Sequence, residues 1–126
     1  MCLYLLSMTA QNYTKGLHLL VDLEQCKRNC EQMEAFRSMI LTAVEAHGLH
    51  VLGSVFHAFD NGAFTAVVCL TESHLSVHTW PEFGRVTFDV FLSNYLQVND
   101  AKGQHLAETI AEFFQGEITM RKEVQR

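Results

Sequence analysis

The sequence predicts an α+β fold: a two-layer sandwich in which an antiparallel sheet has two helices packed on one face. Strand-like stretches outnumber helical ones, in the order β-α-β-β-β-β-α-β. Two helices are too few to connect the strands of a parallel sheet, because each parallel connection needs a crossover. The 126 residues, 48% of them hydrophobic and 18% charged, contain no repeat and no linker-like stretch. We therefore expect a single domain over residues 1–126 with one hydrophobic core.

The first half of the chain is expected to contain a strand, a helix and a hairpin. Residues 16–23 have leucine or valine at every second position, which is the period of a strand with one buried face. Residues 29–47 have apolar side chains three and four apart, as an amphipathic helix does, and Gly48 can cap its C-terminus. The runs 49–59 and 63–70 are rich in β-branched and aromatic residues and flank an Asp-Asn-Gly turn, which predicts a β-hairpin.

The second half is expected to contain two strands, a helix and a last strand. Residues 74–80 and 85–92 alternate between apolar and polar side chains, and a proline-containing turn separates them. An apolar stripe predicts a helix over residues 100–115, and residues 118–124 can add the final strand. The residues suited to cap this helix stand at its two ends: Asn99 or Asp100 at the start and Gly116 at the finish.

Charge and composition exclude several classes of partner. The net charge is −5, from 9 basic and 14 acidic residues, and no basic run stands out, so nucleic acid is not expected as a partner. No apolar run approaches the ~20 residues of a membrane-spanning helix, and the apolar residues 1–10 lack the basic start of a signal peptide. We expect a cytoplasmic protein without a membrane partner, whose cysteines are free, reduced thiols: Cys2, Cys26, Cys30 and Cys69.

Seven histidines raise the question of a metal site. They form neither an HExxH motif nor a Cys/His knuckle, and His74 and His78, which can share a strand face, have no carboxylate between them. We therefore expect no metal. Backbone groups are expected to hydrogen-bond the other strand histidines: His18, His50 and His57.

Residues 71–82 are denser in reactive side chains than an ordinary strand. Hydroxyl, imidazole and carboxylate groups follow one another here, where a plain strand would use apolar residues and threonine. Two interpretations are open. The stretch is a polar strand edge that leads into the turn at Pro81, or it is a catalytic segment.

A resemblance favours catalysis. The string ESHLSVHTWPE, residues 72–82, resembles the signature of the S-adenosylmethionine decarboxylase family in its small bacterial and archaeal form. Three further segments resemble strands of that family: GLHLLVDLEQC, GLHVLGSVFHAF and FDVFLSN. The similarity extends over roughly residues 16–115.

The resemblance implies an enzyme that makes its own cofactor by cutting its own chain. The Ser73 hydroxyl would attack the carbonyl carbon of Glu72, and the resulting ester would eliminate to leave a pyruvoyl group. The products would be a β chain, 1–72, and an α chain, 73–126. His78 matches the family's processing histidine and is the candidate proton acceptor. Thr65, eight residues before the pyruvoyl position, matches a Ser or Thr that assists processing.

The implied reaction is decarboxylation on the pyruvoyl group, and here the sequence departs from the family. The ketone would form a Schiff base with the substrate amine and accept the electrons left when CO2 departs. The family's proton donor is a cysteine twenty residues after the pyruvoyl serine, but position 93 (73 + 20) is Ser93. A serine hydroxyl is a far weaker acid than a thiol, whose unperturbed pKa is ~8.5. Asn94 replaces the family's next glycine, and residues 63–66 replace its Gly-x-Ser/Thr-Gly pattern.

Two residues match the family's substrate contacts. Glu82 stands where a carboxylate bonds the ribose hydroxyls, and Phe59 matches the aromatic residue that stacks on adenine. Each has a simpler alternative, because Glu82 can be a turn residue and Phe59 can pack in the core. The resemblance also implies a homodimer in which each active site is shared between the two subunits.

Three functions are open at this point. The first is conversion of S-adenosylmethionine to decarboxylated S-adenosylmethionine in polyamine biosynthesis, with Ser93 or water as a less efficient proton donor. The second is a pyruvoyl-dependent decarboxylase of a basic amino acid, arginine or ornithine, on the same scaffold. The third is a non-catalytic paralogue that regulates an active copy.

Overall fold

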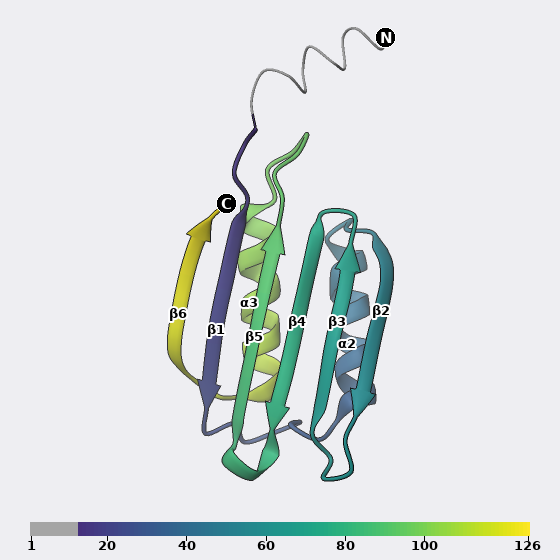
Figure 1. Ribbon diagram of the computed structural model, residues 1–126, viewed down its shortest axis with the longest axis vertical. Coiled ribbons are helices and arrows are strands. Elements are labelled where there is room, and N and C mark those ends of the chain that lie inside the picture. Colours follow the sequence, from purple (N-terminus) through teal and green to yellow (C-terminus); the bar gives the residue numbers. More distant parts are fainter. Residues whose placement is uncertain (1–12) are drawn as a thin grey trace, which may run out of the picture.

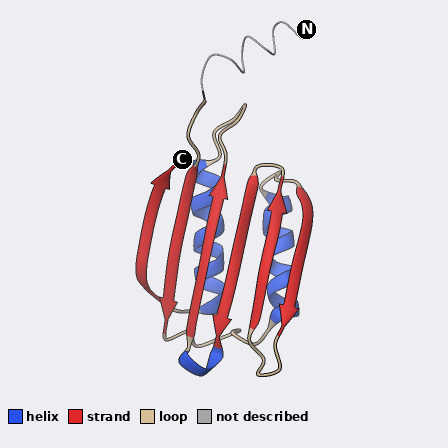
Figure 2. Cartoon of the chain, viewed as in Figure 1, coloured by secondary structure: helices blue, strands red, loops and turns tan. Residues whose placement is uncertain are grey.

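The computed structural model describes residues 13–126, which form a six-stranded antiparallel sheet with helices on one side (Figures 1 and 2). Neighbouring strands follow the order β2-β3-β4-β5-β1-β6. The bounds of the elements are as follows: β1 (Leu17–Glu24), α2 (Met33–Ala46), β2 (Val51–Ala58), β3 (Phe64–Leu70), β4 (Ser73–Trp80), the 3-10 turn η1 (Pro81–Phe83), β5 (Arg85–Leu92), α3 (Asp100–Phe114) and β6 (Glu117–Gln125). The predicted α+β class and the predicted order of elements are confirmed.

The strand alternation explains why only one face of the sheet is covered. In β4 and β5 every second side chain is buried. Helix α3 packs on β1 and β5 and α2 packs on β2, and Figure 1 shows both helices behind the sheet. Phe36 of α2 and Phe114 of α3 stack with their ring centroids 5.8 Å apart. Each such buried side chain contributes about 1.5–3 kcal/mol to the driving force for folding.

On the other side of the sheet, which we call the open face, none of residues 13–126 forms a helix (Figure 2). Its side chains are those that alternate with the buried ones, and they include polar groups from neighbouring strands: His18 of β1, Thr65 of β3, His74, Ser76 and His78 of β4, and Thr87 and Asp89 of β5. Strand β4 lies between β3 and β5 rather than at an edge of the sheet. The interpretation of residues 71–82 as a polar strand edge is therefore wrong.

Helix α2 begins later than its apolar spacing predicts, at Met33 instead of residue 29. Asn29 adopts a left-handed φ of 70°, and its side-chain amide donates to the Phe113 carbonyl at 2.8 Å. This tertiary contact holds the chain out of helical geometry for one more turn. The predicted C-terminal cap is confirmed, since Gly48 follows the helix with a φ of 73°.

The predicted caps of α3 are wrong in both cases. Asn99 stands at the N-cap position, but its side-chain amide donates to the Ser93 carbonyl at 2.9 Å and leaves the helix uncapped. At the other end Gln115, with a φ of 51°, takes the left-handed position expected of Gly116. A Cβ atom on Gly116 would lie 2.6 Å from the Cys26 sulfur, so this glycine is needed for close packing.

The predicted hairpin between β2 and β3 is confirmed. The Phe59 amide donates to the Ala63 carbonyl at 2.8 Å, and Gly62 accommodates a φ of 88° in the turn. Phe59 is thereby placed at the tip of the hairpin with half of its surface exposed, 50%. The alternative that Phe59 packs in the core is wrong.

Residues 13–126 include three of the four cysteines and both predicted helices, so they bear on the expected free thiols and on the expected lack of a membrane-spanning helix. Cys26, Cys30 and Cys69 are free, as expected, while Cys2 and the residues considered for a signal peptide lie outside the described part of the chain. Burial and the neighbouring Cys30 raise the pKa of the Cys26 thiol to about 12, so this thiol is uncharged at neutral pH. Neither described helix has the length and apolar content to cross a membrane.

Candidate active site

The bond expected to be cut lies at the start of β4, after the tight turn from β3. Ser73 pairs with Leu70 across that turn and with Leu92 of β5. Its φ of 144° is a conformation that glycine adopts easily and serine rarely. A residue held in such a region stores on the order of 1–3 kcal/mol of strain. The strain is located at the residue whose backbone nitrogen forms the Glu72–Ser73 bond.

The carbonyl group of that bond is held by Ser93. The Ser93 backbone N–H donates to the Glu72 carbonyl oxygen at 2.7 Å, next to the Ser73–Leu92 pair of β4 and β5. A donor at this position could also stabilise negative charge that develops on that oxygen. The Ser93 carbonyl accepts from the Asn99 side chain at 2.9 Å. Gly16 passes so close that a Cβ atom there would lie 2.9 Å from the Ser93 Cα. Ser93 is therefore fixed on three sides, beside a cavity of about 510 Å³ that Glu72 and Ser93 line together.

The Glu72 side chain is held by the segment before β2. Its carboxylate accepts from the His50 backbone N–H at 3.4 Å and lies 3.8 Å from the His50 ring. This distance to the ring suits a loose ion pair and is too long for a hydrogen bond, so the expected backbone partner of the His50 ring stays a prediction. His57, the third histidine of that group, packs its ring edge-on against Phe59, with centroids 4.8 Å apart.

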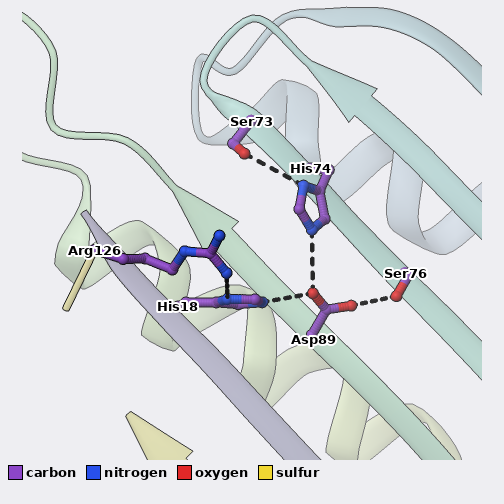
Figure 3. Close-up of polar contacts among 6 residues, drawn as sticks. All are labelled: His18, Ser73, His74, Ser76, Asp89 and Arg126. Carbon is purple, nitrogen blue, oxygen red and sulfur yellow. Dashed lines mark hydrogen bonds and ion pairs between the residues drawn. The ribbon is translucent and has the colours of Figure 1, made fainter. Parts of the chain in front are cut away.

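A chain of polar contacts runs from Ser73 across the open face to β1 (Figure 3). The Ser73 hydroxyl lies 3.3 Å from His74 Nδ1, and His74 Nε2 lies 3.1 Å from the Asp89 carboxylate. His18 Nε2 lies 2.6 Å from the same carboxylate oxygen, and Ser76 donates to the other. The expectation of a backbone partner for His18 is thus wrong, since Asp89 is its partner.

The balance of forces on Asp89 keeps it ionised. Burial raises its pKa, but the hydrogen bonds from Ser76 and His18 and the adjacent His74 outweigh burial, so the pKa of Asp89 lies below its ordinary value. Two imidazoles and one carboxylate within 4.8 Å of one another are also a donor set that a divalent metal could use. Hydrogen bonds already account for the arrangement of these groups, and the absence of a metal stays a prediction.

The lowered pKa of Asp89 predicts a loss of stability in acid. The folded state favours the carboxylate, so Asp89 contributes stability above its ordinary pKa of 3.8, and this contribution disappears as the pH falls through the lower folded value. Asp89→Asn should lower the free energy of unfolding by about 1–3 kcal/mol at pH 7, and its stability should fall less between pH 5 and pH 2. Urea unfolding in a Ser73→Ala background, where every chain stays whole, measures both. Asp60→Asn, in the hairpin loop, is the control, and equal acid slopes for Asp89→Asn and the parent would contradict the account.

The remaining predicted site residues gather at the other end of β4. His78 Nδ1 lies 2.5 Å from the Thr65 hydroxyl, which donates to the Val77 carbonyl at 3.3 Å. When the Thr65 hydroxyl donates to Val77, His78 donates through Nδ1 and Nε2 is free to accept a proton. Phe59, Glu82, Thr65 and His78 all line one cavity of about 420 Å³. Glu82 lies in the turn η1 and accepts from the Asn61 side chain at 3.1 Å.

The predicted site residues thus form two separate clusters. The cleavage cluster contains Glu72, Ser73 and Ser93, and the pocket cluster contains Thr65, His78, Phe59 and Glu82. Ser73 and His78 are five residues apart on one strand, which at ~3.3 Å per residue separates them by about 16 Å. One copy of the chain does not bring the two clusters together.

Comparisons with known proteins point to one family. The family described as S-adenosylmethionine decarboxylase matches residues 17–126. The S-adenosylmethionine decarboxylase proenzyme of Thermodesulfovibrio yellowstonii is 29% identical over 119 residues, 88% of either chain. The proenzyme of Synechococcus sp. is 34% identical over 96 residues, 75% of either chain. The solved structure of the adenosylmethionine decarboxylase of Aquifex aeolicus VF5 is similar, with a TM-score of 0.71, 27% identity and 91% of both chains covered.

Proposed function

Because the chain belongs to the S-adenosylmethionine decarboxylase family, we propose that it is a carboxy-lyase that converts S-adenosylmethionine to decarboxylated S-adenosylmethionine in polyamine biosynthesis. The main structural support for this proposal is the conformation of the Glu72–Ser73 peptide bond and its hydrogen bonding. Its serine is strained, with a φ of 144°, and its carbonyl accepts a 2.7 Å hydrogen bond from Ser93. A cytoplasmic location stays a prediction.

Self-cleavage at this bond is the first step of the proposal. The Ser73 hydroxyl attacks the Glu72 carbonyl carbon, and the peptide bond is exchanged for an ester with a free amine at residue 73. Loss of the Ser73 Cα proton then expels the Glu72 carboxylate, which ends the 1–72 chain. The dehydroalanine left on the 73–126 chain takes up water and releases ammonia to become a pyruvoyl group. The strain at Ser73 supports the proposal, since breaking the bond relieves it.

The residues around Ser73 fit a pyruvoyl group. When formed, such a ketone captures the substrate amine and withdraws electrons from the bond to the departing carboxylate. The Ser93 N–H, now on the Glu72 carbonyl, is placed to orient a polar group at that position. Beside it, the cavity of about 510 Å³ gives the substrate room to approach. The fit rests on the Ser93 N–H and on the cavity beside it.

The pocket cluster is proposed as the substrate-binding half of the site. Phe59 offers an exposed ring for adenine, and Glu82 offers a carboxylate for the ribose hydroxyls. In the same cavity Thr65 orients His78, so that Nε2 can accept the proton lost in the elimination step. Glu82 can be a turn residue and also bind the ribose, since a turn residue at the rim of a cavity can contact a ligand.

The distance between the clusters supports a homodimer with shared sites. His78 lies about 16 Å along β4 from Ser73, too far for proton transfer within one chain. A second copy facing the open face can bring its pocket cluster to the first copy's cleavage cluster, and a two-fold axis then completes both sites at once. The proposal therefore assigns Glu72, Ser73 and Ser93 to one subunit, and Thr65, His78, Phe59 and Glu82 to the other.

Substrate choice is tested by decarboxylation assays run side by side. Purified protein is given S-adenosylmethionine, arginine or ornithine, each labelled in its carboxyl carbon, and labelled CO2 is counted. Release from S-adenosylmethionine alone is the expected result. Release from arginine or ornithine would replace it with the basic amino acid reaction, and a cleaved chain that releases no CO2 from any of them would favour the regulatory paralogue.

The replacement of the family's cysteine predicts a gain of function. Ser93→Cys should raise the turnover of S-adenosylmethionine by on the order of 10–10²-fold, because a thiol is a much stronger acid for reprotonating the product carbon. It should also lower the fraction of enzyme inactivated per turnover. Steady-state kcat and the intact mass of the 73–126 chain after turnover measure the two effects. Ser54→Cys adds a thiol to β2 far from Ser93 as the control, and unchanged turnover in Ser93→Cys would contradict a proton-donor role at this position.

A further inference from the structure

The side chain that follows the nucleophile is aimed at it. His74 Nδ1 lies 3.3 Å from the Ser73 hydroxyl oxygen, and its Nε2 lies 3.1 Å from Asp89 (Figure 3). An ionised carboxylate only accepts hydrogen bonds, so Nε2 must carry the ring proton. Nδ1 then presents its lone pair to the Ser73 hydroxyl. This is the order of groups in a nucleophile–histidine–carboxylate arrangement.

The carboxylate in this arrangement is itself held by two donors. Ser76 donates to one oxygen of Asp89, and His18 Nε2 donates to the other at 2.6 Å. Arg126 donates to His18 Nδ1 at 3.3 Å, and this contact requires the proton of His18 to be on Nε2. Contacts from β1 and β4 hold the Asp89 side chain, and Arg126, beyond the end of β6, holds His18. Together they fix the orientation of Asp89 and, through it, the tautomer of His74.

We propose that His74 is the base that takes the proton of the Ser73 hydroxyl in self-cleavage, and that Asp89 positions it. The inference rests on the proposed function and gives a role to a residue of the signature string to which the resemblance assigned none. As the Ser73 oxygen bonds to the Glu72 carbonyl carbon, its proton passes to His74 Nδ1. The bond from that carbon to the Ser73 nitrogen then breaks, and His74 returns the proton to the leaving nitrogen. The products are an ester and a free amine, and no other reactant is needed.

The Glu72 carbonyl group, which the Ser73 hydroxyl attacks, is held by a hydrogen bond from Ser93. Negative charge develops on the Glu72 carbonyl oxygen during the attack, and the Ser93 N–H already donates to that oxygen at 2.7 Å. The φ of 144° at Ser73 raises the energy of the uncleaved state. Base, nucleophile and oxyanion donor are thus all present in one copy of the chain, before any partner binds.

His74 and His78 are assigned to different steps for a geometric reason. His78 of the same chain is about 16 Å from Ser73 and cannot accept its hydroxyl proton. In the proposed dimer the partner's His78 would serve the later elimination, which removes the Cα proton. The two histidines can therefore be separated by asking whether the ester forms.

Hydroxylamine makes that distinction, because it cleaves esters and leaves peptide bonds whole at neutral pH. Uncleaved precursor is isolated under denaturing conditions and refolded, and the fragments 1–72 and 73–126 are followed by mass spectrometry with and without hydroxylamine. His74→Ala should cleave at least about 10²-fold more slowly than wild type, and hydroxylamine should release no fragments from it. His78→Ala should accumulate the ester and release both fragments with hydroxylamine. His105→Ala, on the surface of α3, is the matched control and should cleave as wild type does.

The positioning role of Asp89 is tested by comparing the cleavage rates of two substitutions at this position. Asp89→Asn preserves the shape of the side chain and removes the charge, whereas Asp89→Glu keeps the charge and changes the length. If Asp89 acts through the tautomer of His74, cleavage should slow at least about tenfold in Asp89→Asn and recover in part in Asp89→Glu. A purely structural role predicts the opposite order, because asparagine fits the site better than glutamate.

Failure of the inference and failure of the proposed function give different results. If His74→Ala cleaves at the wild-type rate, or releases fragments with hydroxylamine as fast as His78→Ala, another group is the base and the inference is overturned while self-cleavage stands. A wild-type chain that stays whole under all conditions overturns self-cleavage and the role of His74 together. Circular dichroism of each variant identifies any chain that has failed to refold, and imidazole added to folded His74→Ala should restore cleavage in proportion to its concentration.

Discussion

Ser73→Ala is expected to abolish both self-cleavage and decarboxylation. Without the hydroxyl there is no nucleophile for the Glu72 carbonyl, so neither the ester nor the ketone derived from it can form. The purified variant should have the mass of the single 126-residue chain, and its release of CO2 from S-adenosylmethionine should be at background. Because the serine and the ketone are the same residue, no other group can substitute for it, and the effect should be complete.

The matched control is Ser38→Ala, which removes an exposed hydroxyl from α2 on the covered side of the sheet. This variant should cleave and turn over as wild type does. The urea midpoint of Ser73→Ala should be close to that of an uncleaved wild-type precursor, which shows that the fold is intact. Fragments of 1–72 and 73–126 from Ser73→Ala would contradict the assignment of the nucleophile.

Co-expression of two inactive variants is expected to restore activity. Ser73→Ala damages the cleavage cluster and His78→Ala damages the pocket cluster, and each variant alone should be inactive. In a mixed dimer with shared sites, one site receives both damaged clusters and the other receives two intact ones. Random pairing makes half of the dimers mixed, so the preparation should show about a quarter of wild-type decarboxylation per chain. Only the chain with an intact Ser73 should be cleaved.

The control for complementation is a pair of variants that both lack Ser73, so that no combination of subunits forms a complete site. Co-expression of Ser73→Ala with the double variant Ser73→Ala/His78→Ala leaves every site without a nucleophile, and it should give no activity. Different affinity tags on the two chains allow the mixed dimer to be purified and its cleavage to be counted directly. A mixed dimer without activity would contradict the division of the site between two copies.

The architecture could be predicted from the sequence because the strands have one buried face. Alternation in residues 16–23, 74–80 and 85–92 requires leucine and valine on one side only, and such strands need helices on that side. The helix boundaries were less predictable, since they depend on contacts between distant residues. The side chain of Asn29 bonds to the end of α3, and that of Asn99 bonds to Ser93, where local spacing indicated a helix start or a cap.

The signature residues were found from the resemblance, but their division into two clusters was not. The pocket residues Phe59 and Glu82 come together through a hairpin tip and a 3-10 turn, and their distance from Ser73 follows from the length of β4. The alternation of residues 74–80 places His74 with His78 on one strand face and indicates no other partner. Its actual partner, Asp89, lies fifteen residues away, and only the register of β4 with β5 places the two together.

The strained backbone at Ser73 could not be predicted from the sequence either. Serine has no preference for a φ of 144°, so this conformation is imposed by the turn from β3 and by the pairing with β5. The same holds for the Ser93 N–H on the Glu72 carbonyl, since backbone donors leave no trace in the residue pattern. Both features come from the fold, and both act on the one peptide bond.

The most direct test is the intact mass of the purified protein after borohydride reduction in the presence of S-adenosylmethionine. Two fragments are expected, 1–72 and 73–126, with covalently attached substrate or product on the 73–126 fragment alone, because only a ketone at position 73 can hold the amine for reduction. A single undivided chain, or a 73–126 fragment whose mass stays unchanged by substrate and borohydride, would contradict the formation of a ketone at position 73.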